Sequence, residues 1–245
     1  MGISATNYDE AVASILAAAR DGAKAVVTAA PVHAVVSAAR DPELLPKMNS
    51  LELVVPDGQP IRWALNLIHR TRLVDRVYGP ELMLRVCRGA ARHATPVYLY
   101  GSAPHVVERL RANLLRWFPG LQLVGWESPP FRPLTPEEDR AVVERINRSG
   151  ARIVFIGLGC PRQDEFAFAH RPLLQAVQIC VGAAFDFHSG NKRMAPAWMQ
   201  RRGLEWLFRL VTEPRRLWRR YFVTNSIFVV RLTRDLVRSR FVRHA

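Results

Sequence analysis

The sequence predicts an α/β fold in which a Rossmann-like, mostly parallel sheet carries helices on both faces and is followed by a basic helical appendage. Apolar runs of strand length alternate with helix-length amphipathic segments, which favours a parallel sheet with helical crossovers. Several of these apolar runs end in glycines and polar side chains, as buried strands do at a binding face. The composition changes after about Lys192, so we predict an α/β core at residues 1–192 and an arginine-rich appendage at residues 193–245.

In the first part of the core, two successive strands end in a polar residue. The apolar residues from Tyr8 onward have helical spacing, which ends at Asp21-Gly22. The apolar run that follows is a predicted strand, and Thr28 comes directly after it in a predicted loop. The next apolar run delivers the turn sequence Pro56-Asp57-Gly58. The elements predicted here are a helix at 8–20, a strand at 25–27, helices at 31–40 and 41–49, and a strand at 51–55.

The second part of the core continues the alternation after a stretch of mixed polarity at 61–73. Thr135-Pro136-Glu137-Glu138 is a capping box with proline at the first helical position, which predicts the start of a helix. In the proline-rich loop before it, Phe131 is a candidate for covering a site. The elements predicted here are helices at 80–93, 104–118 and 136–149, and strands at 97–100, 121–125, 153–156 and 177–181.

The stretch from Ile153 to Gly190 has the composition of a binding site for a polar, partly anionic ligand. Gly157 and Gly159 follow its first strand and let a ligand approach the main chain closely. Pro161 suits the first turn of a helix, whose N-terminus would face a bound anion. The hydrogen-bonding side chains of the stretch include Gln163, Asp164 and Asp186.

Composition narrows the class of partner and the compartment. Hydrophobic residues at 49% exclude disorder throughout, and a net charge of +14 implies an acidic partner. Nucleic acid, an anionic membrane surface and phosphorylated substrates each satisfy that charge. The three cysteines lack CxxC or Cys/His spacing, which favours a reducing, cytoplasmic setting. Neither a secretory leader nor an apolar segment of spanning length is recognised.

The predicted appendage concentrates the positive charge. It holds thirteen arginines against three acidic residues, which is ten of the fourteen net positive charges. Val229, Leu232 and Leu236 share one face of a predicted helix, and arginines occupy the opposite face. A basic amphipathic helix favours docking on an anionic membrane surface, and a solvated basic face is the alternative.

Four motifs give the chain a resemblance to a known family. They are VVPDG at 54–58, RVYGPEL at 76–82, GLGCPRQDE at 157–165 and VGAAFDFHSGNKRMAPAWMQRRGLEWLFRLVTEPRRLWRRY at 181–221. In this order they resemble the WecG/TagA/CpsF glycosyltransferases, bacterial enzymes that pass a sugar from a UDP-sugar to a lipid-linked acceptor at the cytoplasmic face of the membrane. The resemblance covers roughly residues 8–221.

The resemblance also implies roles for individual residues. It makes Asp57 the catalytic base and places Arg76 beside the donor. The positions that match the family's functional residues are Thr28, Asp57, Arg76, Gln163 and Asp186. The chain departs from the family at Ala30, where many members have asparagine, and at Asp164, where they have glutamate. The loss of the asparagine leaves the identity of the donor sugar open.

Each candidate residue also has a structural interpretation. Pro-Asp-Gly is a common turn, and threonine, glutamine and aspartate are common helix caps. Asp186, between two phenylalanines, also fits a buried acid paired with an arginine. The chain has no Asp-x-Asp metal signature, and Glu137-x-Asp139, which has the same spacing, belongs to a helix start. We therefore predict no metal and no cofactor, with arginines and backbone N–H groups balancing the diphosphate. The appendage arginines that are candidates for binding substrate phosphates are Arg209, Arg215, Arg216, Arg219 and Arg220.

These observations predict an inverting, metal-independent hexosyltransferase that moves a sugar from a UDP-sugar to a polyprenyl-diphosphate-linked sugar. The product would serve synthesis of a cell-surface polysaccharide or a teichoic-acid-type glycan. The enzyme would work at the inner face of the cell membrane, held on the anionic surface by its appendage. The alternative is a basic nucleic-acid-binding α/β protein, but no recognition helix or stacking aromatics are arranged for nucleic acid. The sequence leaves the acceptor, its linkage and any homo-oligomer open.

Overall fold

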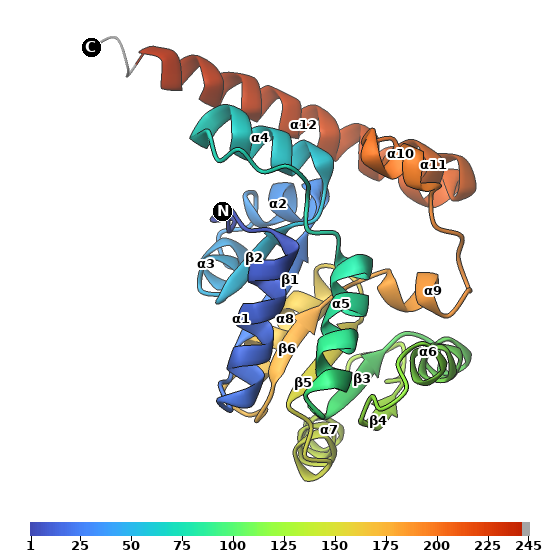
Figure 1. Ribbon diagram of the computed structural model, residues 1–245. Helices are drawn as coiled ribbons and strands as arrows, with labels where there is room; N and C mark the ends of the chain where they lie inside the picture. The colour runs from blue at the N-terminus through green and yellow to red at the C-terminus, as the bar shows by residue number, and fades with distance from the viewer. Residues whose placement is uncertain (242–245) are drawn as a thin grey trace.

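Six parallel strands form the central sheet of the computed structural model, which describes residues 1–241 (Figure 1). The strands are β1 (Val26–Ala30), β2 (Leu53–Pro56), β3 (Val97–Gly101), β4 (Leu123–Glu127), β5 (Ile153–Gly157) and β6 (Val177–Cys180). Their order across the sheet is β2-β1-β6-β5-β3-β4, and every neighbouring pair is parallel. The carboxyl ends of all six strands therefore lie along one edge.

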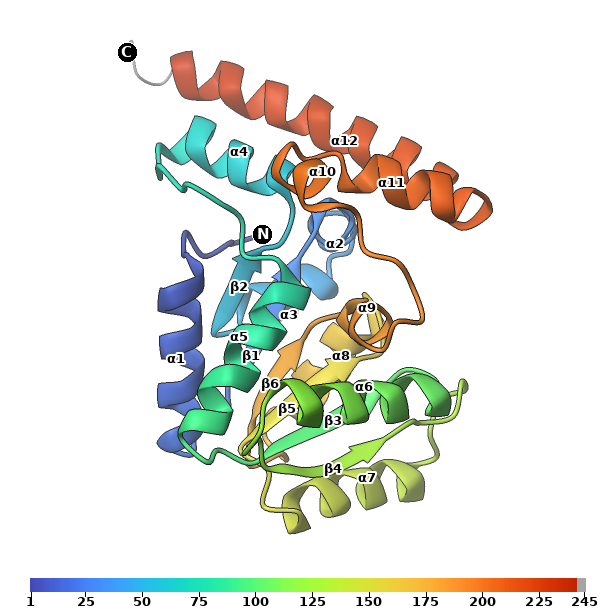
Figure 2. The ribbon, with the colours of Figure 1, turned by 45° about the vertical axis from the view of Figure 1, so that its right-hand side comes forward.

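Helices cover both faces of the sheet, which confirms the predicted Rossmann-like α/β class (Figure 2). The helices of the core are α1 (Tyr8–Arg20), α2 (Val32–Ala38), α3 (Leu44–Asn49), α4 (Gln59–His69), α5 (Gly79–Arg92), α6 (Pro104–Trp117), α7 (Pro136–Arg148), α8 (Arg162–His170) and α9 (Ala184–His188). Buried side chains of α1, α5, α6 and α9 form one core layer, and those of α2, α3, α7 and α8 form the other.

Local sequence explains where several of these elements begin. The predicted capping box at Thr135 is present, and Asn7 makes a second capping box at the start of α1. The apolar runs of β5 and β6 are buried on both faces, as expected for interior parallel strands.

Several elements differ from the predicted positions, and α3 and β2 begin three and two residues later than predicted. β1 continues to Ala30 because its backbone pairs with β2 as far as Pro56, so Thr28 lies inside the strand instead of in a loop. Most of the stretch at 61–73 forms α4, which ends at Arg70 in the left-handed conformation, at φ 55°. The edge strand β4 begins two residues later than predicted, and its alternating burial is typical of an edge strand that packs on one face.

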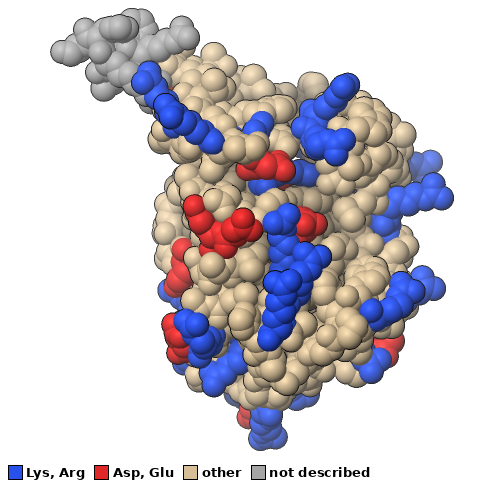
Figure 3. Space-filling view, viewed as in Figure 1, with Lys and Arg blue, Asp and Glu red and all other residues tan. Residues whose placement is uncertain are grey.

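The C-terminal segment forms three helices above the carboxyl edge of the sheet, namely α10 (Ala197–Arg201), α11 (Glu205–Thr212) and α12 (Pro214–Phe241). In Figures 1 and 2, α12 lies across α2 and α4. The last four residues of the predicted appendage lie outside the described residues. Figure 3 shows basic side chains on these upper helices and also on the body below, where acidic side chains lie among them.

Candidate active site

Asp57 lies directly after β2, at the start of the turn into α4. Its Oδ1 accepts a hydrogen bond of 2.6 Å from the backbone N–H of Gly79, at the N-terminus of α5. A side chain at Gly79 would approach Ala29 Cβ to 3.2 Å and the Val181 carbonyl oxygen to 3.3 Å. Glycine is therefore the residue that lets the α5 N-terminus sit against β1 and hold this carboxylate.

The environment of Asp57 raises its pKa to about 6. Burial is the main cause, and the nearby charge of Glu205 adds to it. Arg76, the Gly79 N–H group and Arg209 act in the opposite direction but do not cancel the effect of burial. At neutral pH the carboxylate is thus ionised yet much more basic than an exposed aspartate, which suits general base catalysis.

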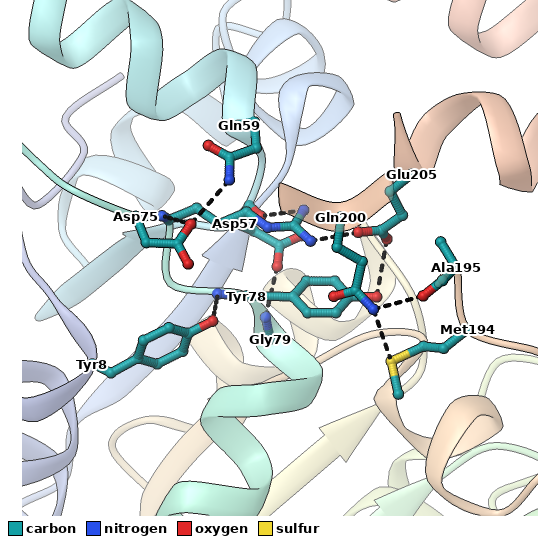
Figure 4. Close-up of polar contacts among 11 residues, drawn as sticks. Tyr8, Asp57, Gln59, Asp75, Tyr78, Gly79, Met194, Ala195, Gln200 and Glu205 are labelled. Carbon is teal, nitrogen blue, oxygen red and sulfur yellow. Dashed lines mark hydrogen bonds and ion pairs between the residues drawn. The ribbon is translucent and has the colours of Figure 1, made fainter. Parts of the chain in front are cut away.

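Arg76 connects Asp57 to the C-terminal helices (Figure 4). Its guanidinium is buried and donates to the backbone carbonyl of Asp57 at 3.2 Å and to Glu205 Oε2 at 2.6 Å. It also stacks on the Tyr78 ring, 4.1 Å from the ring centroid, and Tyr78 donates its hydroxyl hydrogen to Glu205 Oε1 at 2.9 Å. The charge of Arg76 is therefore balanced by Glu205, and its contacts fix the backbone of Asp57.

Glu205 is a residue of this candidate site that the sequence analysis missed. It is buried on α11, although α11 is otherwise largely exposed, and it serves both Arg76 and Tyr78. A signal for it was present, because Glu205 is one of only three acidic residues among the thirteen arginines of the C-terminal segment. A lone carboxylate in such a basic segment is a candidate partner for a buried arginine.

The charges of three of the five candidate arginines act on His33, and two of them, Arg209 and Arg220, are partly buried. The third, Arg216, is exposed and forms an ion pair with Glu213. The pKa of His33 is lowered to about 3, mainly by burial and in addition by the charges of Arg220, Arg209 and Arg216. The charge of Arg209 also reaches Asp57, and Arg220 lies near Cys160 in the loop after β5. The like charges of Arg209 and Arg220 repel one another, so a bound anion would stabilise their arrangement.

The two other candidate arginines, Arg215 and Arg219, lie exposed on α12. They are four residues apart on the helix and share its outward face with Trp218 and Phe222, whose side chains are also exposed. The structure therefore divides the appendage arginines by burial: Arg209 and Arg220, the inward group, are partly buried near His33, whereas Arg215, Arg216 and Arg219 are exposed.

Thr28, Gln163 and Asp164 are buried and hold neighbouring segments together. The Thr28 hydroxyl donates to Asp164 Oδ1 at 2.5 Å, which joins β1 to α8. Gln163 Oε1 accepts from the Gly182 N–H at 3.0 Å, which joins α8 to the loop after β6. Burial raises the pKa of Asp164. In this structure these side chains shape the carboxyl edge of the sheet through contacts with each other and the main chain.

The two predicted glycines and Asp186 also lie at this edge, where Gly157 ends β5, Gly159 follows it and Asp186 follows β6. A side chain at Gly157 would come within 2.6 Å of the Phe185 ring, and Gly159 adopts a positive φ of 79°. Asp186 accepts from Asn191 Nδ2 at 2.6 Å and lies 3.8 Å from Lys192 Nζ. Phe131 and Gly157 both line a cavity of about 280 Å³ below the proline-rich loop, so Phe131 does lie over a cavity.

A second cavity, of about 410 Å³, opens beside Asp57 and is bounded by α4, α11 and α12. Asp57, Arg76, Glu205 and Arg209 line one part of it. Among the described residues, three buried side-chain atoms that lack a hydrogen-bond partner belong to residues lining this cavity, namely His33 Nε2, Gln59 Oε1 and Arg209 Nε. Such atoms favour a polar ligand that would complete their hydrogen bonds.

Ala30, which departs from the family pattern, is fully buried in the core layer formed with α2 and α3. Its side chain is therefore part of the packing behind the carboxyl edge.

Within residues 1–241, no helix is both long and apolar enough to cross a bilayer. In the same range, no three His, Cys, Asp or Glu side chains gather as metal ligands would.

Comparison with known proteins connects this site to a family. The model of the "Glycosyl transferase WecG/TagA/CpsF family" matches residues 1–241. A Bacillus spizizenii protein named N-acetylglucosaminyldiphosphoundecaprenol N-acetyl-beta-D-mannosaminyltransferase is 33% identical over 196 residues, which cover 80% of this chain and 73% of that protein. A Bacillus subtilis protein of the same name is 28% identical over 197 residues, covering 80% of this chain and 74% of that protein.

Proposed function

The chain belongs to the WecG/TagA/CpsF family of glycosyl transferases, and on that premise we propose that it transfers N-acetylmannosamine from a UDP-sugar to N-acetylglucosaminyl-diphospho-undecaprenol. The acceptor and the transferred sugar are those in the names of the two Bacillus relatives. The observation that carries the proposal is the partly buried carboxylate of Asp57, with its raised pKa, on the cavity that Arg209 also lines.

In the proposed reaction, a hydroxyl of the acceptor sugar attacks the anomeric carbon while the bond from that carbon to the UDP oxygen breaks. Asp57 accepts the proton of the attacking hydroxyl. Its Oδ1 is held by the Gly79 N–H, so Oδ2 is the oxygen available for that proton. Attack from the side opposite UDP inverts the configuration at the anomeric carbon.

The leaving UDP gains negative charge, which the inward arginines are placed to balance. Arg209 and Arg220 lie near His33, and Arg220 is also close enough to Cys160, in the loop after β5, for their charges to interact. Arg216 acts on His33 from an exposed position, where it pairs with Glu213. Guanidinium groups bind phosphates through several charge-assisted hydrogen bonds. We therefore propose that these arginines, instead of a divalent metal, hold the diphosphate of the donor.

The outward face of the C-terminal helices supports a peripheral position on an anionic membrane. Arg215 and Arg219 share this face with Trp218 and Phe222, whose exposed fractions are 59% and 73%. Arginine attracts anionic lipid headgroups, and aromatic side chains insert at the interface. We propose that this face rests on the inner leaflet, where the lipid-linked acceptor is presented.

A product assay tests the proposed function. The full-length chain is incubated with N-acetylglucosaminyl diphosphate on a lipid carrier and, in parallel, with UDP-N-acetylmannosamine, UDP-N-acetylglucosamine or UDP-glucose, all in EDTA. We expect a product whose mass exceeds that of the acceptor by one N-acetylhexosamine, formed with UDP-N-acetylmannosamine. No product with any donor would contradict the proposed reaction, and product only after addition of a divalent cation would contradict the arginine assignment.

The acidic limb of the pH profile is a further expected result. Below its pKa, Asp57 is protonated and cannot accept a proton, so kcat/KM should rise with pH and level off above about pH 6. Glu205→Gln removes a charge that raises the pKa of Asp57, so this limb should move to lower pH. A limb near the pKa of an exposed aspartate, or one that Glu205→Gln leaves in place, would show that another group controls the rate.

A further inference from the structure

The cavity beside Asp57 extends between two helices that lie side by side, α4 and α12 (Figures 1 and 2). The lining residues recur at helical spacing, so each helix contributes one stripe to the walls. The stripe on α4 consists of Pro60, Trp63 and Leu67, and the stripe on α12 consists of Tyr221, Asn225, Phe228 and Leu232. We call the space between the two stripes the α4–α12 groove.

The polarity of the groove changes along its length. At the Asp57 end, the hydrogen-bonding groups of Gln59, His33 and Asn225 line the walls. Farther along both helices the lining is apolar, and Leu67 is 57% exposed. Counted from Pro60 to Leu67, the α4 stripe runs for about 10 Å at 1.5 Å per residue. An apolar strip that stays open to solvent and is continuous with a polar site is typical of a binding groove.

We propose that the α4–α12 groove binds the isoprenoid chain next to the diphosphate of the acceptor, an inference that rests on the proposed function. The acceptor carries a sugar at one end, a diphosphate in the middle and an apolar chain at the other end. The groove offers the matching order, with the Asp57 carboxylate, then hydrogen-bonding groups, then Trp63, Phe228 and Leu232. The acceptor hydroxyl would reach Asp57 while the isoprenoid chain extends along the groove away from it.

Burial of the isoprenoid chain in the groove predicts which acceptors the protein prefers. Removing apolar surface from water stabilises a complex by about 25 cal/mol per Å². The wild-type chain should therefore use an acceptor that carries a farnesyl group at least tenfold better in kcat/KM than one that carries a methyl group. Leu67→Asp places a charge at the exposed end of the groove and should remove most of this preference, measured as the ratio of kcat/KM for the two acceptors on the same variant.

The matched control is Leu173→Asp, because Leu173 is 49% exposed and lies between α8 and β6, away from the groove. It should keep the farnesyl preference, and the two variants should have equal melting temperatures. Calorimetric titration of the wild-type protein with farnesyl diphosphate measures binding to the groove without turnover. We expect binding to the wild type, and we expect Leu67→Asp to weaken it at least tenfold.

Several results would overturn the inference while leaving the proposed function intact. They are transfer to both acceptors without preference, equal loss of preference in both variants, no binding of farnesyl diphosphate, or a Leu67→Asp effect confined to vesicle binding or to self-association. Absence of transfer to either acceptor would instead contradict the proposed function.

Discussion

Replacement of Asp57 by asparagine should lower kcat for sugar transfer by about 10²- to 10⁴-fold, the range that a positioned general base contributes. The amide oxygen of asparagine can still accept the Gly79 N–H, so the turn between β2 and α4 should keep its structure. Donor binding should persist, because the arginines near His33 are unchanged. The measurements are single-turnover transfer and UDP binding on the same preparation.

Stability gives this variant an independent readout. The raised pKa means that folded Asp57 holds its proton more tightly than the unfolded chain does, so its ionisation costs stability as pH rises from about 4 through 6. Asp57→Asn should remove that cost, leaving a melting temperature at pH 8 at or above that of the wild type. Asp21→Asn, at an exposed residue paired with Arg20, is the control and should change neither property. Undiminished turnover in Asp57→Asn would exclude this carboxylate as the base.

Ending the chain at Lys192 should abolish transfer to the lipid acceptor and reduce binding to anionic vesicles. The truncation removes Glu205 from Arg76 and Tyr78, removes the arginines near His33, and uncovers α2 and α4. The loss of transfer thus has two physical causes, a disordered Asp57 backbone and a missing anion site. Transfer at the wild-type rate by the truncated chain would contradict the assignment of these helices to the active site.

A full-length variant separates the membrane role from the catalytic role. Arg215→Gln combined with Arg219→Gln changes only the outward face, where both residues are exposed. This variant should bind anionic vesicles less tightly, by about 1 kcal/mol for each arginine removed, and should transfer sugar to a soluble acceptor at the wild-type rate. Equal losses in both assays would instead support the sequence-based prediction that these two arginines bind substrate phosphates.

The sheet and its carboxyl edge could be predicted because their signals are local. Apolar runs mark β5 and β6, the capping box marks α7, and Asp57 follows a strand directly. The boundary of β1 was placed wrongly because Thr28 is polar, and local polarity does not reveal that its hydroxyl is satisfied by Asp164, 136 residues away.

The contacts that make the site could not be predicted from periodicity. The ion pair of Arg76 and Glu205 joins residues 129 apart in the sequence, and it depends on how α11 packs over the strand ends. The difference between inward and outward arginines on α12 has the same origin. Arg219 and Arg220 are neighbours in the sequence, and only the packing of the helix against α2 and α4 leaves Arg220 partly buried near His33 and Arg219 exposed.

The most direct test of the central claim is a crystal structure of the full-length chain with UDP-N-acetylmannosamine bound. We predict that the diphosphate lies among Arg209, Arg216 and Arg220, and that the anomeric carbon lies in the cavity beside the Asp57 carboxylate, with room between them for the acceptor hydroxyl. A sugar bound below the proline-rich loop, in the cavity lined by Phe131 and Gly157 and away from Asp57, would contradict the account.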